Sequence, residues 1–209
     1  MSTSTWPQDP DWFAARLRKE IDRYVALGDG QVSALYRHFV LLGRWNAKLN
    51  LTSVRSPEEA IVRHYCESLF FAAHIPEAAP GSRFCDVGSG AGFPGIPVAV
   101  AQPAWHVALI ESHQRKGVFL REATRPLPNV EVLSTRAETV TQNFDWLISR
   151  AVDPADVLRL LPRLASRVGL LLGSDDAAKI SGDARFQIVA STPLPWGDRR
   201  VCLYGHCFT

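Results

Sequence analysis

The fold of this 209-residue chain is decided by the stretch Phe84-Cys85-Asp86-Val87-Gly88-Ser89-Gly90-Ala91-Gly92-Phe93-Pro94-Gly95. An apolar run typical of a buried strand passes here into a glycine-rich turn. Glycines suit a tight strand-to-helix turn because they adopt positive φ, and a ligand touches backbone amides only where no Cβ intrudes. The stretch therefore predicts a nucleoside cofactor at the turn.

The glycine spacing disfavours a dinucleotide. The dinucleotide fingerprint is Gly-x-Gly-x-x-Gly, whereas this turn has Gly88-x-Gly90-x-Gly92, with Phe93 where the third glycine would fall. The turn amides favour an anion, but Asp86 at the mouth of the loop would repel a pyrophosphate and suit an ammonium or sulfonium group. We therefore expect S-adenosylmethionine, which carries both cations.

An acid follows the next predicted strand. Glu111 ends the apolar run 105–110 and stands 19 residues after Gly92, where a carboxylate accepts hydrogen bonds from ribose hydroxyls. The alternative is that the glycines only make a turn and Glu111 is a solvated strand end.

Composition predicts one α/β domain with an appendage. Hydrophobic residues make up 46% and charged residues 21% of the chain, and no apolar run approaches the ~20 residues of a membrane helix. The N-terminal residues lack a basic region followed by an apolar stretch, so we expect a cytoplasmic protein that binds no membrane. The oligomeric state expected is a monomer.

The four cysteines predict neither a zinc site nor disulfides. Cys66, Cys85, Cys202 and Cys207 show no Cys-x-x-Cys spacing, which fits unpaired thiols in a reducing compartment and no metal. The net charge of +2 is too small to indicate a nucleic-acid partner without local clusters.

Residues 1–80 form a predicted helical region packed on the core, and residues 81–209 the cofactor-binding domain. Asp9-Pro10 starts a first helix that runs toward Gly28, and a second helix is expected at about 31–48. Ser56-Pro57-Glu58-Glu59 forms a capping box that opens a third helix.

Residues after 81 alternate between strand and helix patterns. The expected fold is α/β, a doubly wound, mostly parallel, seven-stranded sheet. Strands are expected near 83–87, 105–110, 130–133, 145–149, 168–172, 186–191 and 200–207, and helices at 94–101, 113–125 and 154–166. Residues 193–197 form a turn short enough for a hairpin.

Polar residues follow four of the strands, where ligands of such sheets collect. Ala137 and Glu138 are placed to cover an adenine, although Arg136 and Glu138 also suit a surface ion pair. Arg150 either reaches the cofactor cleft or forms a structural pair with Asp86 or Glu138.

Basic residues cluster in two windows that suit RNA phosphates. The candidates are Arg37, Arg44 and Lys48 in the first window and Arg115 and Lys116 in the second. A solvated helix face is the alternative for either cluster.

The signatures of other methyl transfers are absent. Adenine amino methylation usually needs an Asn/Asp-Pro-Pro-aromatic motif where this chain has Ser149-Arg150-Ala151-Val152, and no cysteine is placed as a nucleophile for carbon methylation. Ring nitrogen 7 of guanine fits better, because it attacks the methyl group without losing a proton.

The chain resembles the bacterial 16S rRNA guanine-7 methyltransferases, the glucose-inhibited division protein B family. The resemblance spans about residues 40–155 and rests on 45–52 (Trp-Asn-Ala-Lys-Leu-Asn-Leu-Thr), His64 with Glu67-Ser68-Leu69, 86–97, 111–116 with 119–121, Asn129-Val130, 136–138, and 144–145 with 149–151. The family often has Asp at Glu67, two lysines at Arg115-Lys116, and a lysine before Gly173 where this chain has Leu172.

The resemblance implies an S-adenosylmethionine-dependent enzyme acting on a guanine in the decoding-region loop of 16S rRNA, met as RNA or as a small ribosomal subunit. It implies cofactor contacts at Gly88, Phe93, Glu111, Ser112, His113, Ala137, Glu138 and Arg150. Asn46, His64 and Arg150 match positions on the substrate side, with no general base expected. Two alternatives stay open: a small-molecule or protein acceptor, and a cofactor-sensing module without turnover.

Overall fold

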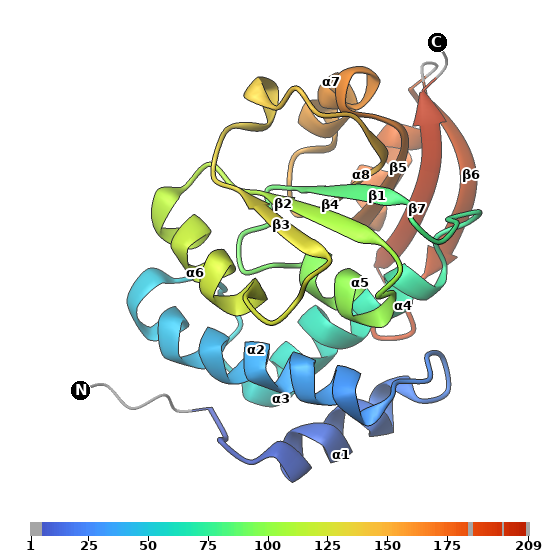
Figure 1. Ribbon diagram of the computed structural model, residues 1–209. Coiled ribbons are helices and arrows are strands. Elements are labelled where there is room, and N and C mark those ends of the chain that lie inside the picture. The colour runs from blue at the N-terminus through green and yellow to red at the C-terminus, as the bar shows by residue number, and fades with distance from the viewer. Residues whose placement is uncertain (1–5, 184–185, 198, 208–209) are drawn as a thin grey trace.

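In the computed structural model, which describes residues 6–183, 186–197 and 199–207, a seven-stranded sheet has the order β3-β2-β1-β4-β5-β7-β6 (Figure 1). The strands are β1 Arg83–Val87, β2 His106–Ile110, β3 Val130–Leu133, β4 Phe144–Arg150, β5 Ala165–Gly173, β6 Phe186–Pro193 and β7 Arg200–Cys207. Strands β1 to β5 pair in parallel, whereas β7 is antiparallel to β5 and β6. The predicted mostly parallel sheet and the terminal hairpin are confirmed.

The strand order reverses at the centre of the sheet. The chain passes from β1 outward through β2 to β3 and then returns to β4 on the other side of β1. In such sheets, the crevice at the carboxyl ends of the strands around this reversal is the preferred ligand site. The glycine loop follows β1 directly, so the fold places it in this crevice.

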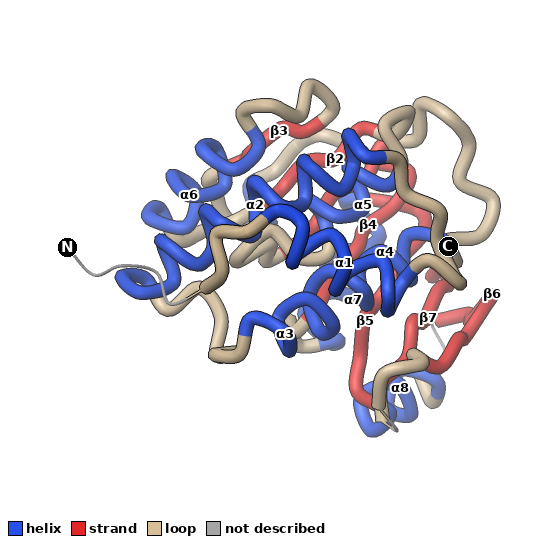
Figure 2. The backbone as a smooth tube through the Cα atoms, turned by 90° about the horizontal axis from the view of Figure 1, so that it is seen from below, coloured by secondary structure: helices blue, strands red, loops and turns tan. Residues whose placement is uncertain are grey.

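Helices cover both faces of the sheet. Helices α7 (Pro154–Leu164) and α8 (Ser174–Ser181) pack on one face, where the core includes Leu147, Leu161 and Ile180. Helices α5 (Gly95–Ala101) and α6 (Gln114–Thr124) lie on the other face with the N-terminal helices (Figures 1 and 2).

The N-terminal helices share the core of that second face. They are α1 (Pro10–Ile21), α2 (Asp29–Leu49) and a continuous helical stretch of α3 (Pro57–Ala60), the π-helical segment η1 (Ile61–Cys66) and α4 (Glu67–Ala73). Phe13, Phe39 and Tyr65 from these helices belong to the same buried cluster as Phe84 and Trp146 of the sheet. The division of the chain at residue 80 stays a prediction.

Helix starts agree with their predicted caps. The Asp9 side chain accepts hydrogen bonds from the backbone N–H groups of Asp11 and Trp12, and Ser56 Oγ accepts one from Glu59 N–H. The reciprocal half of the predicted capping box is replaced, because the Glu59 carboxylate pairs with Arg63 instead.

Three features differ from the predicted elements. Helix α1 ends at Ile21 rather than near Gly28, since the chain turns there and packs the ring of Tyr24 against Phe70 and Trp196. Helix α8 was not predicted. Residues 137–139 form a single 3₁₀ turn, η2 (Ala137–Thr139).

No helix in the described part of the chain has the length and apolar character needed to cross a bilayer. Among the same residues, no group of three or more His, Cys, Asp or Glu side chains could hold a metal ion. Cys66, Cys85 and Cys202 are free and buried, and burial raises the pKa of the Cys202 thiol to about 12. The Cys207 side chain and the N-terminal residues 1–5 lie outside the described part.

Candidate cofactor and substrate site

The loop between β1 and α5 is a tight turn closed by its own backbone. Gly88, Gly90 and Gly92 have φ of 74°, 56° and 89°. A Cβ on Gly88 would lie 2.6 Å from Val152 Cγ2, so this position requires glycine. The Gly88 and Ser89 N–H groups donate to the Ile110 carbonyl, which ties the loop to the end of β2.

Glu111 holds the loop from the side. Its Oε2 accepts a hydrogen bond from Gly90 N–H at 2.9 Å, and its Oε1 accepts one from His113 N–H at 2.8 Å. The Gly92 and Phe93 N–H groups donate to the Ser89 carbonyl. These amides already have acceptors within the protein, so the loop does not offer the expected anion cradle.

The structure places Asp86 beneath the loop rather than at its mouth. Its carboxylate is fully buried, with Oδ2 accepting a hydrogen bond from Gly95 N–H at 3.0 Å. Oδ1 is buried and has no hydrogen-bond partner among the described residues. Burial raises the pKa of Asp86 to about 7, and the nearby Glu111 carboxylate adds to the rise, while the Gly95 N–H opposes it.

Two carboxylates therefore lie against a loop whose N–H groups are already used. This arrangement disfavours a diphosphate and suits a cationic ligand, because the loop N–H groups that are already used offer a diphosphate no donors and the Glu111 carboxylate lies beside the loop. The residues present thus fit S-adenosylmethionine. When bound, that cofactor supplies a methyl group carried on a sulfonium.

Two cavities meet at the loop. The first has a volume of about 480 Å³ and the second about 420 Å³, and Gly88 lines both. The first is lined by residues 51–54, 63–64, 88–91, Phe93, Lys116, 150–151, 171–173 and Arg200. The second is lined by residues 87–88, Ile110, Ser112, 135–138, Val152, Asp156 and Leu160.

The second cavity brings together four of the predicted cofactor residues, Gly88, Ser112, Ala137 and Glu138. Gly90 and Phe93 line the first. Glu111, His113 and Gly92 line neither cavity: Glu111 braces the loop, His113 precedes α6, and a Cβ on Gly92 would lie 2.4 Å from Ile96 Cδ1.

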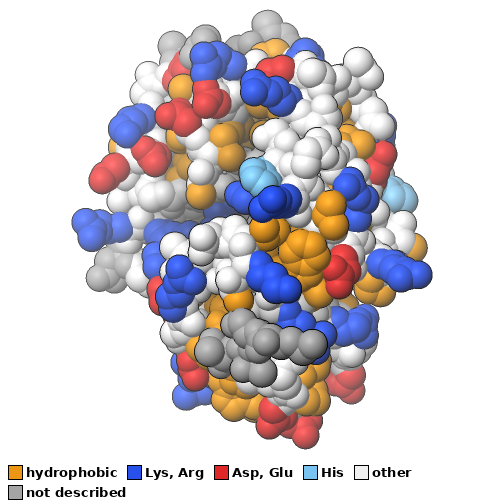
Figure 3. Space-filling model, turned by 90° about the vertical axis from the view of Figure 1, so that its left-hand side faces the viewer, with side chains coloured by type: hydrophobic (Ala, Val, Ile, Leu, Met, Phe, Trp, Pro, Cys, Tyr) orange, Lys and Arg blue, Asp and Glu red, His pale blue; other side chains and the backbone are white. Residues whose placement is uncertain are grey.

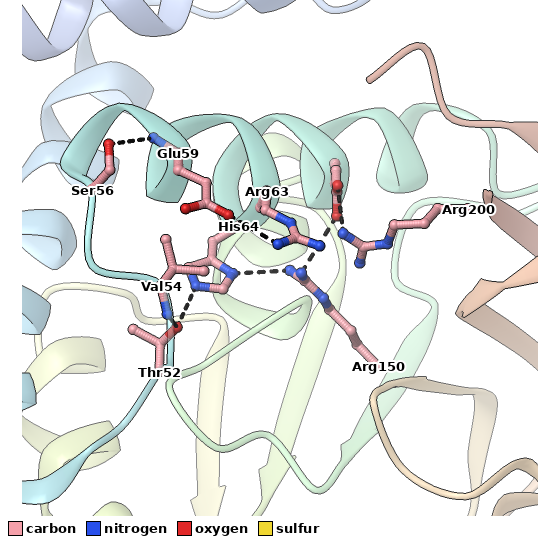
Figure 4. A network of polar contacts seen from close by, with 9 residues as sticks. Thr52, Val54, Ser56, Glu59, Arg63, His64, Arg150 and Arg200 are labelled. Carbon is pink, nitrogen blue, oxygen red and sulfur yellow. Dashed lines mark hydrogen bonds and ion pairs between the residues drawn. The ribbon is translucent and has the colours of Figure 1, made fainter. Parts of the chain in front are cut away.

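His64 joins the substrate side of the first cavity to β4. Its ring stacks on Phe93 with centroids 4.7 Å apart. Arg150 Nη1 donates to His64 Nδ1 at 3.1 Å, and His64 Nε2 lies 2.7 Å from Thr52 Oγ1 (Figure 4). Burial and the charge of Arg150 lower the pKa of His64 well below its usual value.

The buried acid that partners Arg150 is Glu67, not Asp86 or Glu138. Arg150 Nη2 lies 3.4 Å from Glu67 Oε2, and Arg200 Nη1 donates to Glu67 Oε1 at 2.6 Å. Burial raises the pKa of Glu67, and both guanidiniums oppose that rise. Burial lowers the pKa of Arg150 to about 10, with Glu67 opposing.

Asn46 is not brought to either cavity. Its buried Oδ1 accepts a hydrogen bond from Thr52 N–H at 2.8 Å, so it holds the cavity-lining segment from behind.

The predicted RNA-binding residues fall into two places. Lys116 lines the first cavity, and Arg115 is exposed on the same helix. Arg37 and Arg44 line a groove of about 740 Å³ between α2 and α6. Lys48 is exposed on α2. Figure 3 shows many Lys and Arg side chains among hydrophobic ones on the side of the molecule that carries α6.

Sequence reasoning missed the roles of Thr52, Glu67 and Arg200. The signal for Glu67 was an acid within a long apolar helical run, 61–73. Arg200 pairs in register with Gly173 across the β5–β7 ladder, so a guanidinium stands beside the position where the resembled family has a lysine.

A sheet of this order, with a glycine loop after β1 and an acid after β2, defines a class I S-adenosylmethionine-dependent methyltransferase. Solved structures agree on the fold. The S-adenosylmethionine-dependent methyltransferase from Aquifex aeolicus superposes with a TM-score of 0.51 at 18% identity, covering 61% of this chain and 83% of that one. The 23S rRNA methyltransferase ErmE gives 0.50 at 16% identity, covering 68% and 67%.

The family model GidB, rRNA small subunit methyltransferase G, matches residues 31–172. The chain belongs to this family, which confirms the resemblance, and its cofactor is S-adenosylmethionine. Proteins named ribosomal RNA small subunit methyltransferase G are 43% identical in Nitrosospira multiformis (68% of this chain, 67% of that protein), 47% in Nitrosomonas europaea (57% and 56%) and 37% in Burkholderia ambifaria (83% and 82%).

Proposed function

We propose that the chain transfers the methyl group of S-adenosylmethionine to ring nitrogen 7 of a guanine in the decoding-region loop of 16S rRNA. The observation that carries the proposal is the pair of cavities meeting at Gly88 beside the glycine loop. The second cavity suits the adenosine half of the cofactor. The first takes the methyl group and the target base.

The lining of the first cavity suits a reaction that needs no base. Its described residues include no carboxylate, and its titratable groups are His64 and the cations Arg63, Lys116, Arg150 and Arg200. His64 Nδ1 already accepts a hydrogen bond from Arg150, so no lone pair of the ring is left for a substrate proton. Methylation of an amino group or hydroxyl would need such an acceptor.

Guanine nitrogen 7 meets this condition. Its lone pair forms the new N–CH₃ bond while the S–CH₃ bond breaks, and the bonding electron pair of that bond stays on sulfur. The positive charge moves from sulfur to the base, and no proton is transferred. The protein supplies orientation through the loop, Glu111 and the cavity walls, and phosphate complementarity through the basic lining.

Within this proposal, Gly88, Gly90, Phe93, Glu111, Ser112, Ala137 and Glu138 serve the cofactor, and His64 and Arg150 serve the substrate side. RNA contacts fall to Arg37, Arg44, Lys48, Arg115 and Lys116. The proposal includes action as a monomer, because residues of a single chain line both cavities. It also includes action in the cytoplasm, because the proposed substrate is rRNA.

The test is transfer of labelled methyl groups to small-subunit rRNA and to small ribosomal subunits, followed by digestion to nucleosides. The expected product is labelled 7-methylguanosine. Label in another nucleoside, in a protein or in a small molecule would overturn the proposal, as would tight cofactor binding with no product on either RNA substrate.

A further inference from the structure

Thr52, beside the first cavity, is held by three hydrogen bonds. Its N–H donates to Asn46 Oδ1 at 2.8 Å, and its Oγ1 accepts a hydrogen bond from Val54 N–H at 3.1 Å. The third contact is the 2.7 Å approach of His64 Nε2 to the same oxygen (Figure 4). Thr52 itself is half-buried and lines the first cavity.

The direction of the His64–Thr52 bond follows from Arg150. A guanidinium has donors only, so Arg150 Nη1 donates to His64 Nδ1, which then carries no proton. The neutral ring carries its proton on Nε2 and donates it to Thr52 Oγ1. Arg150 therefore determines, through the His64 ring, that Thr52 Oγ1 is the acceptor in its hydrogen bond with His64.

Both acceptor positions of the hydroxyl are then occupied. A threonine hydroxyl has one proton to donate and two lone pairs, and here Val54 N–H and His64 Nε2–H fill the lone pairs. The described residues provide no acceptor for the remaining proton. Thr52 thus contributes to the lining of the first cavity a hydroxyl that can donate but cannot also accept.

We propose that Thr52 determines the choice of purine by donating its hydroxyl proton to oxygen 6 of the target guanine. The proposal rests on the proposed function. Guanine presents nitrogen 7 and oxygen 6 as neighbouring acceptors, whereas adenine presents an amino donor in place of oxygen 6. A hydroxyl that can only donate forms a hydrogen bond with oxygen 6 of guanine, whereas it meets a second donor in the amino group of adenine.

The experiment compares two RNAs that differ only at the target position, which carries guanine or 2-aminopurine. The second base keeps nitrogen 7 and lacks oxygen 6. With labelled S-adenosylmethionine, the unchanged protein is expected to show a kcat/KM for the guanine RNA roughly tenfold to a hundredfold above that for the 2-aminopurine RNA.

Thr52→Val removes the proton while keeping the shape of the side chain. The expected result is that the ratio of kcat/KM between the guanine RNA and the 2-aminopurine RNA falls roughly tenfold or more below that of the unchanged protein, and only the intrinsic difference in nitrogen 7 reactivity remains. Thr52→Ser restores the difference, since serine offers the same proton. Cofactor binding, measured by calorimetry, stays within about threefold in all three proteins.

Each outcome of this experiment either supports the inference about Thr52 or contradicts it. If the unchanged protein methylates both RNAs equally, or if Thr52→Val slows both by the same factor, Thr52 only braces the loop and the inference is wrong. If Thr52→Val does not fold, the ratio measured for the unchanged protein and Thr52→Ser still tests it. Absence of 7-methylguanosine from the unchanged protein would instead overturn the proposed function.

Discussion

Arg200 on β7 donates a hydrogen bond to Glu67 on α4 at 2.6 Å, although 133 positions of sequence separate them. The same carboxylate lies 3.4 Å from Arg150 Nη2 at the end of β4. Three elements are thus joined beneath the first cavity, and the carboxylate is 1% exposed. The guanidiniums of Arg150 and Arg200, which both line the cavity, depend on one buried anion.

Glu67→Gln is expected to lower the free energy of unfolding by about 3 kcal/mol, because it leaves two largely buried guanidiniums without a counter-charge. Urea denaturation at pH 7 measures the change. Glu59→Gln is the matched control, since its pair with Arg63 is exposed and worth less than about 1 kcal/mol. Equal losses in the two variants would show that the buried pairs of Glu67 contribute no more to the free energy of unfolding than the exposed Glu59–Arg63 pair.

Glu111→Gln is expected to weaken S-adenosylmethionine binding by roughly tenfold to a hundredfold. The carboxylate holds the loop through Gly90 N–H and is the predicted ribose acceptor, and hydrogen bonds to charged groups are the stronger kind. Calorimetry with the cofactor and with its demethylated product gives the two affinities. Glu131→Gln, on the exposed side of β3, serves as the control, and similar affinities in both variants would remove Glu111 from the site.

Gly90→Val is expected to abolish cofactor binding while the protein stays folded. At Gly90, a Cβ meets nothing nearer than 3.7 Å, so the added side chain projects into open space at the first cavity. Gly81→Val is the matched control, because Gly81 also has positive φ and open surroundings but lines neither cavity. Both variants lose stability from backbone strain of about 1–2 kcal/mol. Calorimetry should find cofactor binding only in the control.

The strands and the cofactor loop could be predicted because local signals specify them. Apolar runs flanked by turn residues predicted all seven strand starts within three residues, and the glycine spacing identified the loop. Helix α8 escaped prediction, since it has only 8 residues and buries only two side chains, those of Ala177 and Ile180.

The Glu67 cluster could not be predicted from local patterns, because its members come from α4, β4 and β7 and meet only through the sheet order. Asp86 shows a second limit. A strand whose two faces are both buried does not reveal whether its last polar side chain faces the ligand or the core. In the structure it faces the N-terminus of α5.

Asp86 gives a prediction about pH. Its pKa is about 7 in the folded protein and near 3.8 when unfolded, so the folded state binds the extra proton between these values. Its contribution to stability is therefore complete below about pH 4 and is lost as the pH rises through 7, by at most about 4 kcal/mol.

Asp86→Asn removes this titration. Relative to the unchanged protein, the variant should gain free energy of unfolding between about pH 4 and pH 7 and level off above, as followed by urea denaturation at several pH values. Asp145→Asn, which replaces an exposed carboxylate that accepts the Arg83 N–H, is the control for the loss of one carboxylate. Parallel curves for the unchanged protein and Asp86→Asn would contradict the raised pKa.

The basic side chains of α2 give the last prediction. Arg37 lines the groove between α2 and α6, and Lys48 is exposed further along α2, so both are free to meet RNA phosphates. Arg37→Glu with Lys48→Glu should weaken binding to small-subunit rRNA and reduce the slope of log K against log salt by about 2, because each phosphate contact contributes nearly one unit. Cofactor affinity should not change, since neither residue lines the two cavities.

The matched control is Arg159→Glu with Lys179→Glu, on α7 and α8 across the sheet, which makes the same change in net charge. Fluorescence anisotropy over a range of salt concentrations compares the slopes, and equal slopes in the two double variants would assign Arg37 and Lys48 to a solvated helix face.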